Sequence, residues 1–122
     1  MITLLAVGAA AAVGAVARYV LDQYVQYRRP GLFPRGTWLI NITGSFVLGT
    51  VMGLSARHVL PEQAVLIAGV GFCGGYTTFS TFSYELVHLR EKGQVGRSLL
   101  YGTSSLVVGL SAAAAGLAVG SL

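Results

Sequence analysis

Apolar residues fill four long runs of this chain, and short polar segments separate them. The runs cover about residues 2–24, 36–56, 62–89 and 94–119. A helix needs about 20 mostly apolar residues to cross the hydrocarbon core of a bilayer, and each run is long enough. The pattern predicts an all-α membrane protein with four transmembrane helices, and we expect residues 1–122 to form a single integral membrane domain.

The third run carries a polar interruption near its middle. Its apolar start meets the segment CGGYTTFSTFS, where a Gly74-Gly75 pair precedes a cluster of hydroxyl side chains. Irregular backbone persists at membrane depth only when it is buried in protein or lines a wet cavity. A helix interrupted in this way often marks an ion site, although a simple kink at the glycine pair is the alternative. We therefore expect the third helix to be broken near its middle.

Composition agrees with a membrane location and excludes several other classes. Charged residues make up only 10% of the chain, against about 25% in soluble domains. The net charge is +4, but the basic residues lie mainly between the apolar runs, where they set membrane topology, so no nucleic-acid partner is expected. The single cysteine, Cys73, rules out an intrachain disulfide. The chain has no Walker loop, Gly-x-Ser-x-Gly or HExxH motif, and we do not expect an enzyme.

The basic residues are unevenly distributed among the connections. Six lie in the first and third connections: Arg28, Arg29, Arg35, Arg90, Lys92 and Arg97. The second connection has only Arg57. The positive-inside rule therefore favours an orientation with the first and third connections in the cytoplasm and both termini outside.

Small and polar residues within the runs suggest specific contacts. The second and fourth runs each contain a GxxxG pair, and small residues of this kind let membrane helices approach closely. Thr37, Asn41 and Ser45 are spaced i, i+4, i+8 and share one helical face. The Asn41 amide can donate two hydrogen bonds, but Asn in a membrane also joins helices, and the spacing leaves both roles open.

Other side chains could serve an ion path. Phe79 and Phe82 are three residues apart, and the positive edge of an aromatic ring can meet an anion without binding it too tightly to release; packing is the alternative. Arg18 could attract anions or extend to the interface. Tyr101 and Ser105 place hydroxyls on one face of the fourth run, although such hydroxyls often bond to their own helix.

Three segments resemble successive motifs of the Fluc/CrcB fluoride channels. They are GAVARY (14–19), GTWLINITGSFVLG (36–49) and GFCGGYTTFSTFSYE (71–85), in family order and without insertions. The resemblance covers nearly the whole chain. It implies a subunit of the cell membrane that pairs with a second subunit in antiparallel orientation, forming a dual-topology dimer. It also implies passive export of cytoplasmic fluoride and protection from fluoride toxicity.

The resemblance also assigns roles to individual residues. The fluoride ion would pass the ring edges of Phe79 and Phe82 and accept a hydrogen bond from Asn41. The other positions that match the family's pathway are Thr37, Tyr101, Ser105 and Arg18. A structural Na+ ion would lie at the dimer interface, held by the backbone carbonyls of Gly74 and Thr77. One departure is Gly109, where some relatives carry a further serine.

The second subunit and two other functions stay open at this point. The uneven charge suggests one preferred orientation, so the partner is either another copy of this chain or an oppositely biased homologue. A small four-span proton-coupled drug or cation exporter would need a carboxylate deep in the first span, where this chain has only Asp22 near the end. A membrane assembly subunit without transport activity would not need Asn41 or the interrupted third span.

Overall fold

The computed structural model describes all 122 residues and contains only helices and their connections. Three crossings are single helices: α1 (Ile2–Arg28), α2 (Arg35–Ala56) and α6 (Val95–Gly120). The third crossing has four consecutive pieces: α3 (Glu62–Val65), the π-helical segment η1 (Leu66–Cys73), α4 (Gly74–Tyr76) and α5 (Ser80–Glu91). The all-α prediction is confirmed.

All four crossings are long and apolar enough to span a membrane. α1 continues to Arg28, past the expected end at residue 24, and the third crossing continues to Glu91, past residue 89. Both extensions carry long polar side chains, which reach the headgroup region while the helix continues. The chain is therefore a multi-pass membrane protein.

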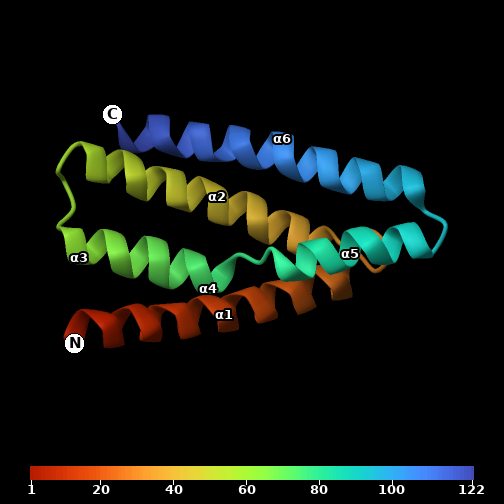
Figure 1. Cartoon of the computed structure of the whole chain (residues 1–122), viewed down its shortest axis with the longest axis horizontal. Helices are drawn as coiled ribbons and strands as arrows, with labels where there is room; N and C mark the ends of the chain where they lie inside the picture. The colour runs from red at the N-terminus through yellow and green to blue at the C-terminus, as the bar shows by residue number, and fades with distance from the viewer.

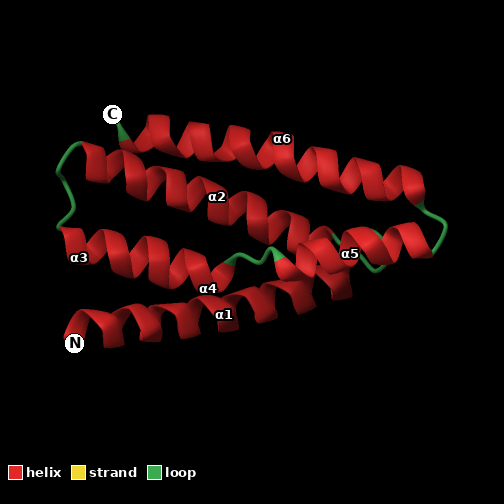
Figure 2. Cartoon of the chain, in the orientation of Figure 1, coloured by secondary structure: helices red, strands yellow, loops and turns green.

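The crossings lie side by side in a bundle (Figures 1 and 2). α6 lies against α2, the third crossing follows, and α1 lies beyond it. Because the number of crossings is even, both termini lie at one end of the bundle, together with the α2–α3 connection. The α1–α2 and α5–α6 connections lie at the other end, and the break between α4 and α5 falls between the two ends.

Glycines determine how closely the helices pack. A Cβ atom at Gly49 would collide with the Ala113 carbonyl, and one at Gly116 would collide with the Phe46 carbonyl. α2 and α6 are therefore in backbone contact at their GxxxG pairs, as the sequence predicted. The third crossing meets α1 in the same way, because a Cβ at Gly75 would collide with the carbonyl of Ala11.

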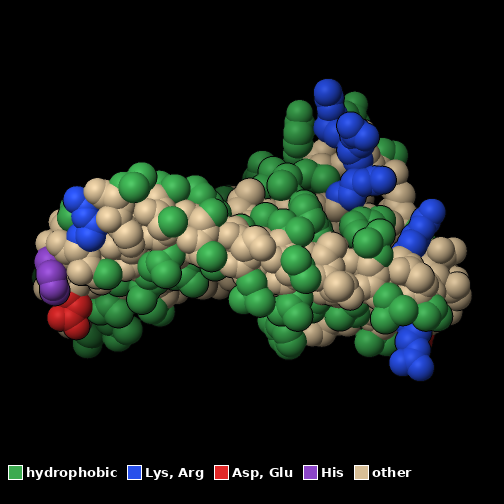
Figure 3. Space-filling view, turned by 90° about the horizontal axis from the view of Figure 1, so that it is seen from above, with side chains coloured by type: hydrophobic (Ala, Val, Ile, Leu, Met, Phe, Trp, Pro, Cys, Tyr) green, Lys and Arg blue, Asp and Glu red, His purple; other side chains and the backbone are tan.

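The chain buries few of its side chains. Only 18 of the 122 residues are buried, and the largest fully buried side chains are Tyr101, Ile40, Leu89 and Thr37. Large apolar side chains point outward along every crossing, and Figure 3 shows them over the face formed by α6 and α2. Such a surface needs lipid or another membrane subunit to cover it.

The third crossing breaks just after its glycine pair. Gly74 keeps helical dihedrals (φ −62°, ψ −40°), and the backbone becomes extended at Thr77 (φ −83°, ψ 160°). The third helix is thus interrupted near its middle, as expected, and the interruption begins two residues after the Gly74-Gly75 pair. The cause is the Thr78 N–H, which donates to the Asn41 side chain instead of continuing the helical ladder to the Gly74 carbonyl. Gly75 serves the close approach of α1 instead.

Candidate functional site

The Asn41 side chain joins α2 to the break in the third crossing through two hydrogen bonds. Its Nδ2 donates to the Thr78 carbonyl oxygen at 2.9 Å, and its Oδ1 accepts from the Thr78 N–H at 2.9 Å. One amide side chain thus satisfies both backbone polar groups of a residue that has left the helix. In hydrocarbon each unsatisfied group would cost several kcal/mol, so the break depends on this contact. The second N–H of the amide has no acceptor in the protein.

Three other contacts stabilise the same segment. Arg18 Nη1 of α1 donates to the Thr77 carbonyl oxygen at 3.3 Å, and Thr77 Oγ1 donates to the Cys73 carbonyl oxygen at 2.8 Å. On the far side of the break, the Thr78 hydroxyl accepts from the Thr81 N–H at 3.2 Å. That last bond satisfies a free donor in the first turn of α5. The hydroxyls that follow the glycine pair therefore end one helix and begin the next.

A hollow of about 320 Å³ opens beside the break. Its polar wall includes Asn41, Ser45, Gly74, Thr77 and Thr78, and Phe79 forms part of its rim. A Cβ atom placed on Gly74 would meet nothing within 4 Å, so the backbone is open on this side. No backbone N–H of the residues that follow donates to the Gly74 carbonyl. The hollow therefore presents backbone oxygens that lack their usual helical donors.

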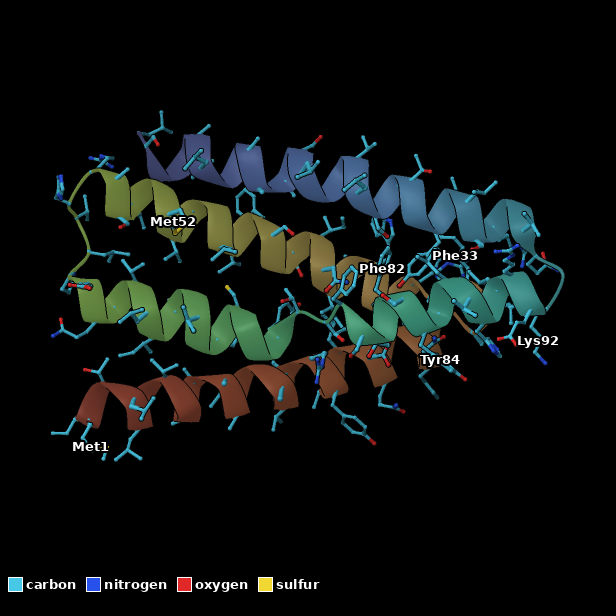
Figure 4. The ribbon with its side chains drawn as sticks, in the orientation of Figure 1. Met1, Phe33, Met52, Phe82, Tyr84 and Lys92 are labelled. Atoms are coloured by element: carbon cyan, nitrogen blue, oxygen red, sulfur yellow. The ribbon has the colours of Figure 1, made fainter.

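A row of aromatic rings leads from this surface into the subunit. Phe79 is 79% exposed, and its ring centroid lies 5.9 Å from that of Phe82. Phe82 lies 5.1 Å from Tyr101, whose ring meets Phe33 edge-on at 5.5 Å. Figure 4 shows Phe82 beside the break, between α5 and α2. The row joins an exposed ring on the third crossing to a fully buried one on α6.

The inner end of this row is polar. Tyr101 is fully buried, and its hydroxyl donates to Glu85 Oε1 at 3.1 Å. Thr37 is 2% exposed and borders both of these side chains. One carboxylate from α5 thus lies among a hydroxyl from α2 and a phenol from α6. The hydroxyl that bonds to this carboxylate belongs to another helix, so spacing along the third run alone could not identify it.

The candidate residues fall into two groups. Asn41, Arg18, Gly74, Thr77 and Phe79 surround the break. The half-buried Phe82 and the buried Thr37 and Tyr101 form a second group behind it. Ser105 lies one turn beyond Tyr101 on α6, and its Oγ is buried with no hydrogen-bond partner.

Comparison with known proteins identifies the chain's family. Residues 5–117 match the family model described as CrcB-like protein, Camphor Resistance (CrcB). The chain belongs to the CrcB-like family. It is 50% identical to a protein of Leifsonia xyli subsp. xyli called Fluoride-specific ion channel FluC 1, over 99% of this chain and 88% of the relative. Fluoride-specific ion channel FluC 1 of Streptomyces avermitilis is 44% identical over 89% of this chain and 88% of the relative, and Fluoride-specific ion channel FluC of Nitrobacter winogradskyi is 42% identical over 95% and 93%.

Two contacts of this CrcB-like chain were not anticipated from its sequence. Trp38 Nε1 of α2 donates to Ser104 Oγ of α6 at 3.0 Å, and Thr43 Oγ1 lies 2.9 Å from the Tyr76 hydroxyl. The first contact joins α2 to α6, which are not consecutive crossings, and the second joins α2 to the crossing that follows it. A polar side chain within an apolar run indicates that it needs a hydrogen-bond partner. The sequence offered several polar residues on other helices as partners and gave no means of choosing among them. Ser45 donates to the Asn41 carbonyl of its own helix at 2.7 Å, so this member of the polar stripe does not join helices.

Proposed function

We propose that the chain is the subunit of a fluoride-specific ion channel that exports cytoplasmic fluoride passively and protects the cell from fluoride toxicity. The observation that carries this proposal is the 50% identity over 99% of the chain to a relative called Fluoride-specific ion channel FluC 1. The site supports it, because an aromatic row and a free amide N–H meet at a break in a membrane helix. An N–H donor and the positive edges of aromatic rings can attract an anion without binding it too tightly to release.

The ion would pass between Asn41 and the two phenylalanines. Fluoride binds its hydration water tightly. A path must therefore replace the hydrogen bonds from water with contacts to the protein, one by one. The unpaired N–H of Asn41 offers one donor, and the ring edges of Phe79 and Phe82 offer a weak positive potential. Weak contacts at successive points let the ion enter and also leave, which conduction requires.

The remaining pathway residues would act on either side of these rings. Tyr101 and Thr37 present hydroxyls at the buried end of the aromatic row, and the unpartnered Ser105 hydroxyl would offer a further donor along α6. Arg18 would contribute a positive potential near the break, because its guanidinium donates to Thr77 there.

The working unit would be a dimer of antiparallel subunits. The open hollow, the 79% exposed Phe79 and the small buried fraction of the single chain all favour a partner across this face. A structural Na+ ion fits the same surface. Hard cations take oxygen ligands, the Gly74 carbonyl lacks a backbone donor, and the Thr77 carbonyl receives only the 3.3 Å bond from Arg18. Two such subunits would supply two carbonyls each. The partner is a second copy or an oppositely oriented homologue.

Transport would need no chemical energy source. Neutral HF enters a cell from acid surroundings and ionises inside, where the anion is trapped. A pore for the anion lets it leave along the membrane potential, which contributes about 2.3 kcal/mol per charge at 100 mV. The proteins of this class are channels, so no catalytic residues are proposed.

The decisive test is fluoride efflux from liposomes that contain wild-type protein or the variants Phe82→Ile and Phe46→Ile. Phe46 is an exposed ring on α2 outside the aromatic row, so its replacement is a matched control. We expect Phe82→Ile to lower the efflux rate at least tenfold and Phe46→Ile to leave it within about twofold. Equal rates for Phe82→Ile and wild type would contradict the proposed path. A drug or cation exporter, or an assembly subunit, would show no fluoride efflux in any of the three proteins.

A further inference from the structure

Two adjoining hollows lie at the end of the bundle that holds the α1–α2 and α5–α6 connections. The outer one has a volume of about 490 Å³ and is bordered by the first connection and by Arg35 and Arg97. The inner one, of about 450 Å³, lies between α1, α2 and α6 and has Trp38 in its wall. Phe33, Arg35 and Leu100 line both hollows, so they form one continuous groove.

The outer hollow is strongly basic. Arg35 and Arg97 are both exposed, and no carboxylate pairs with either guanidinium. The one hydrogen bond of the Arg35 side chain goes to the Arg29 carbonyl oxygen at 3.5 Å. Figure 3 shows the Lys and Arg side chains gathered mainly at this end of the molecule, on the right, whereas the connection at the other end contributes only Arg57. A ligand of this hollow must therefore carry negative charge.

The inner hollow is apolar and lies deeper. Trp38 uses its indole N–H inside the protein, in the bond to Ser104 Oγ at 3.0 Å, and therefore offers the hollow an apolar ring. Five of the seven lining residues are hydrophobic. Along α6, Ser104 is seven residues from Arg97, which corresponds to about 10 Å of rise. The groove thus begins where lipid headgroups lie and ends among their acyl chains.

We propose that this groove binds one anionic phospholipid. Its phosphate would lie between Arg35 and Arg97, and one acyl chain would cover Trp38 and Leu100. Basic pockets between membrane helices on the cytoplasmic side suit such headgroups, because that leaflet is rich in anionic lipid. A zwitterionic lipid would bring an ammonium group to a surface of like charge. This inference depends on the orientation that the positive-inside rule favours, with this end in the cytoplasm, and in an antiparallel dimer it applies to the subunit with that orientation. It does not depend on the proposed fluoride path.

Trp38 makes the proposal directly measurable, because it is the only tryptophan of the chain. The protein is placed in vesicles of unlabelled phosphatidylcholine, to which phosphatidylglycerol or phosphatidylcholine with brominated acyl chains is added. Bromine quenches a tryptophan that it touches, so the quenching curve reports occupancy of the groove. We expect brominated phosphatidylglycerol to bind at least tenfold more tightly than brominated phosphatidylcholine. Each arginine should contribute roughly fivefold.

The variant Arg35→Gln/Arg97→Gln should lower this preference roughly 25-fold. The matched control is Arg28→Gln/Lys92→Gln, which removes two charges from the same end but outside both hollows. It should change the preference less than about threefold. An equal loss in both double variants would overturn the proposal, because it would indicate diffuse attraction instead of a site.

Wild-type protein gives a test that needs no variant. Unlabelled phosphatidylglycerol should relieve quenching by its brominated form, whereas unlabelled phosphatidylcholine at the same concentration should not. Equal quenching by the two brominated lipids would overturn the proposal. Relief of quenching by soluble glycerol 3-phosphate would also overturn it, because the groove would then bind a free anion instead of a lipid.

Discussion

Replacing Asn41 with leucine should separate the break from α2 and destabilise the whole bundle. The change removes two hydrogen bonds of 2.9 Å that satisfy the carbonyl and the N–H of Thr78. Hydrogen bonds between membrane helices contribute about 0.6 kcal/mol on average and up to about 1.7 kcal/mol. The free energy of unfolding should therefore fall by about 1–3 kcal/mol, which is roughly 5- to 150-fold in the unfolding equilibrium constant.

The assay is equilibrium unfolding in mixed micelles, with increasing mole fractions of dodecyl sulfate. Trp38 fluorescence reports the separation of α2 from α6, because its indole N–H bonds to Ser104, and circular dichroism reports helix content. Ser45→Ala is the matched control. Ser45 lies one turn from Asn41 on the same helix, but its hydroxyl bonds only to the Asn41 carbonyl of that helix. Its loss should change the free energy of unfolding by less than about 0.5 kcal/mol.

Asn41→Asp separates the contributions of the two hydrogen bonds to stability. Its carboxylate still accepts from the Thr78 N–H but cannot donate to the Thr78 carbonyl. The variants Asn41→Leu, Asn41→Asp and Ser45→Ala are then compared with wild type for fluoride efflux. Asn41→Leu with wild-type stability would refute the fastening role. A destabilised Asn41→Leu protein that still conducts at the wild-type rate would refute the proposed hydrogen bond to fluoride and leave Asn41 as a fastener alone.

Three further predictions concern packing, a single hydrogen bond and the ion. Gly116→Val should prevent the backbone contact of α6 with α2 and lower the free energy of unfolding by at least about 2 kcal/mol. Gly8→Ala is the control and should be neutral, because a Cβ atom at Gly8 meets nothing within 4 Å. Equal effects of the two changes on unfolding in mixed micelles would contradict this packing. A double-mutant cycle of Trp38→Phe and Ser104→Ala, followed by circular dichroism, should give a coupling of about 0.6 kcal/mol, and strict additivity would show that the 3.0 Å bond adds no stability. Replacing all sodium with N-methylglucamine during reconstitution should lower both the dimer fraction in chemical cross-linking and the fluoride efflux, and an unchanged dimer fraction would count against a structural Na+ ion.

The four crossings could be predicted from sequence because each depends on a local property. A run of about 20 apolar residues must be helical in hydrocarbon, because no water is present there to hydrogen-bond its backbone N–H and C=O groups. The GxxxG contacts followed from the same kind of local rule. The helix ends were less exact, because Tyr and Arg side chains allow a helix to continue into the headgroup region.

A break near the middle of the third crossing could be anticipated, but the residue at which the helix ends could not. Gly74 and Gly75 are the residues most able to leave a helix, and yet they stay helical, because Gly75 is needed for the close approach of α1. The backbone leaves the helix where a side chain of another helix, Asn41, takes over its hydrogen bonds. That exchange depends on the axial register of α2 against the third crossing, which no spacing within one run specifies.

The buried polar group shows the same limit. Glu85, Thr37 and Tyr101 belong to three different helices, and no spacing within one run shows that their side chains meet. The resemblance assigned Thr37 and Tyr101 to the path, whereas the bond from Tyr101 to Glu85 became visible only in the packed structure. The π-helical turn of η1 also has no local sequence rule that would have predicted it.

The most direct test of the fluoride-channel proposal is ion efflux from liposomes that contain only this purified chain. A fluoride electrode follows release after valinomycin is added to potassium fluoride-loaded vesicles, and a chloride electrode follows matched vesicles loaded with potassium chloride. We expect rapid fluoride release and no chloride release above that of empty liposomes. Equal release of both ions, or no fluoride release from folded protein either alone or together with an oppositely oriented homologue, would contradict a fluoride-specific channel.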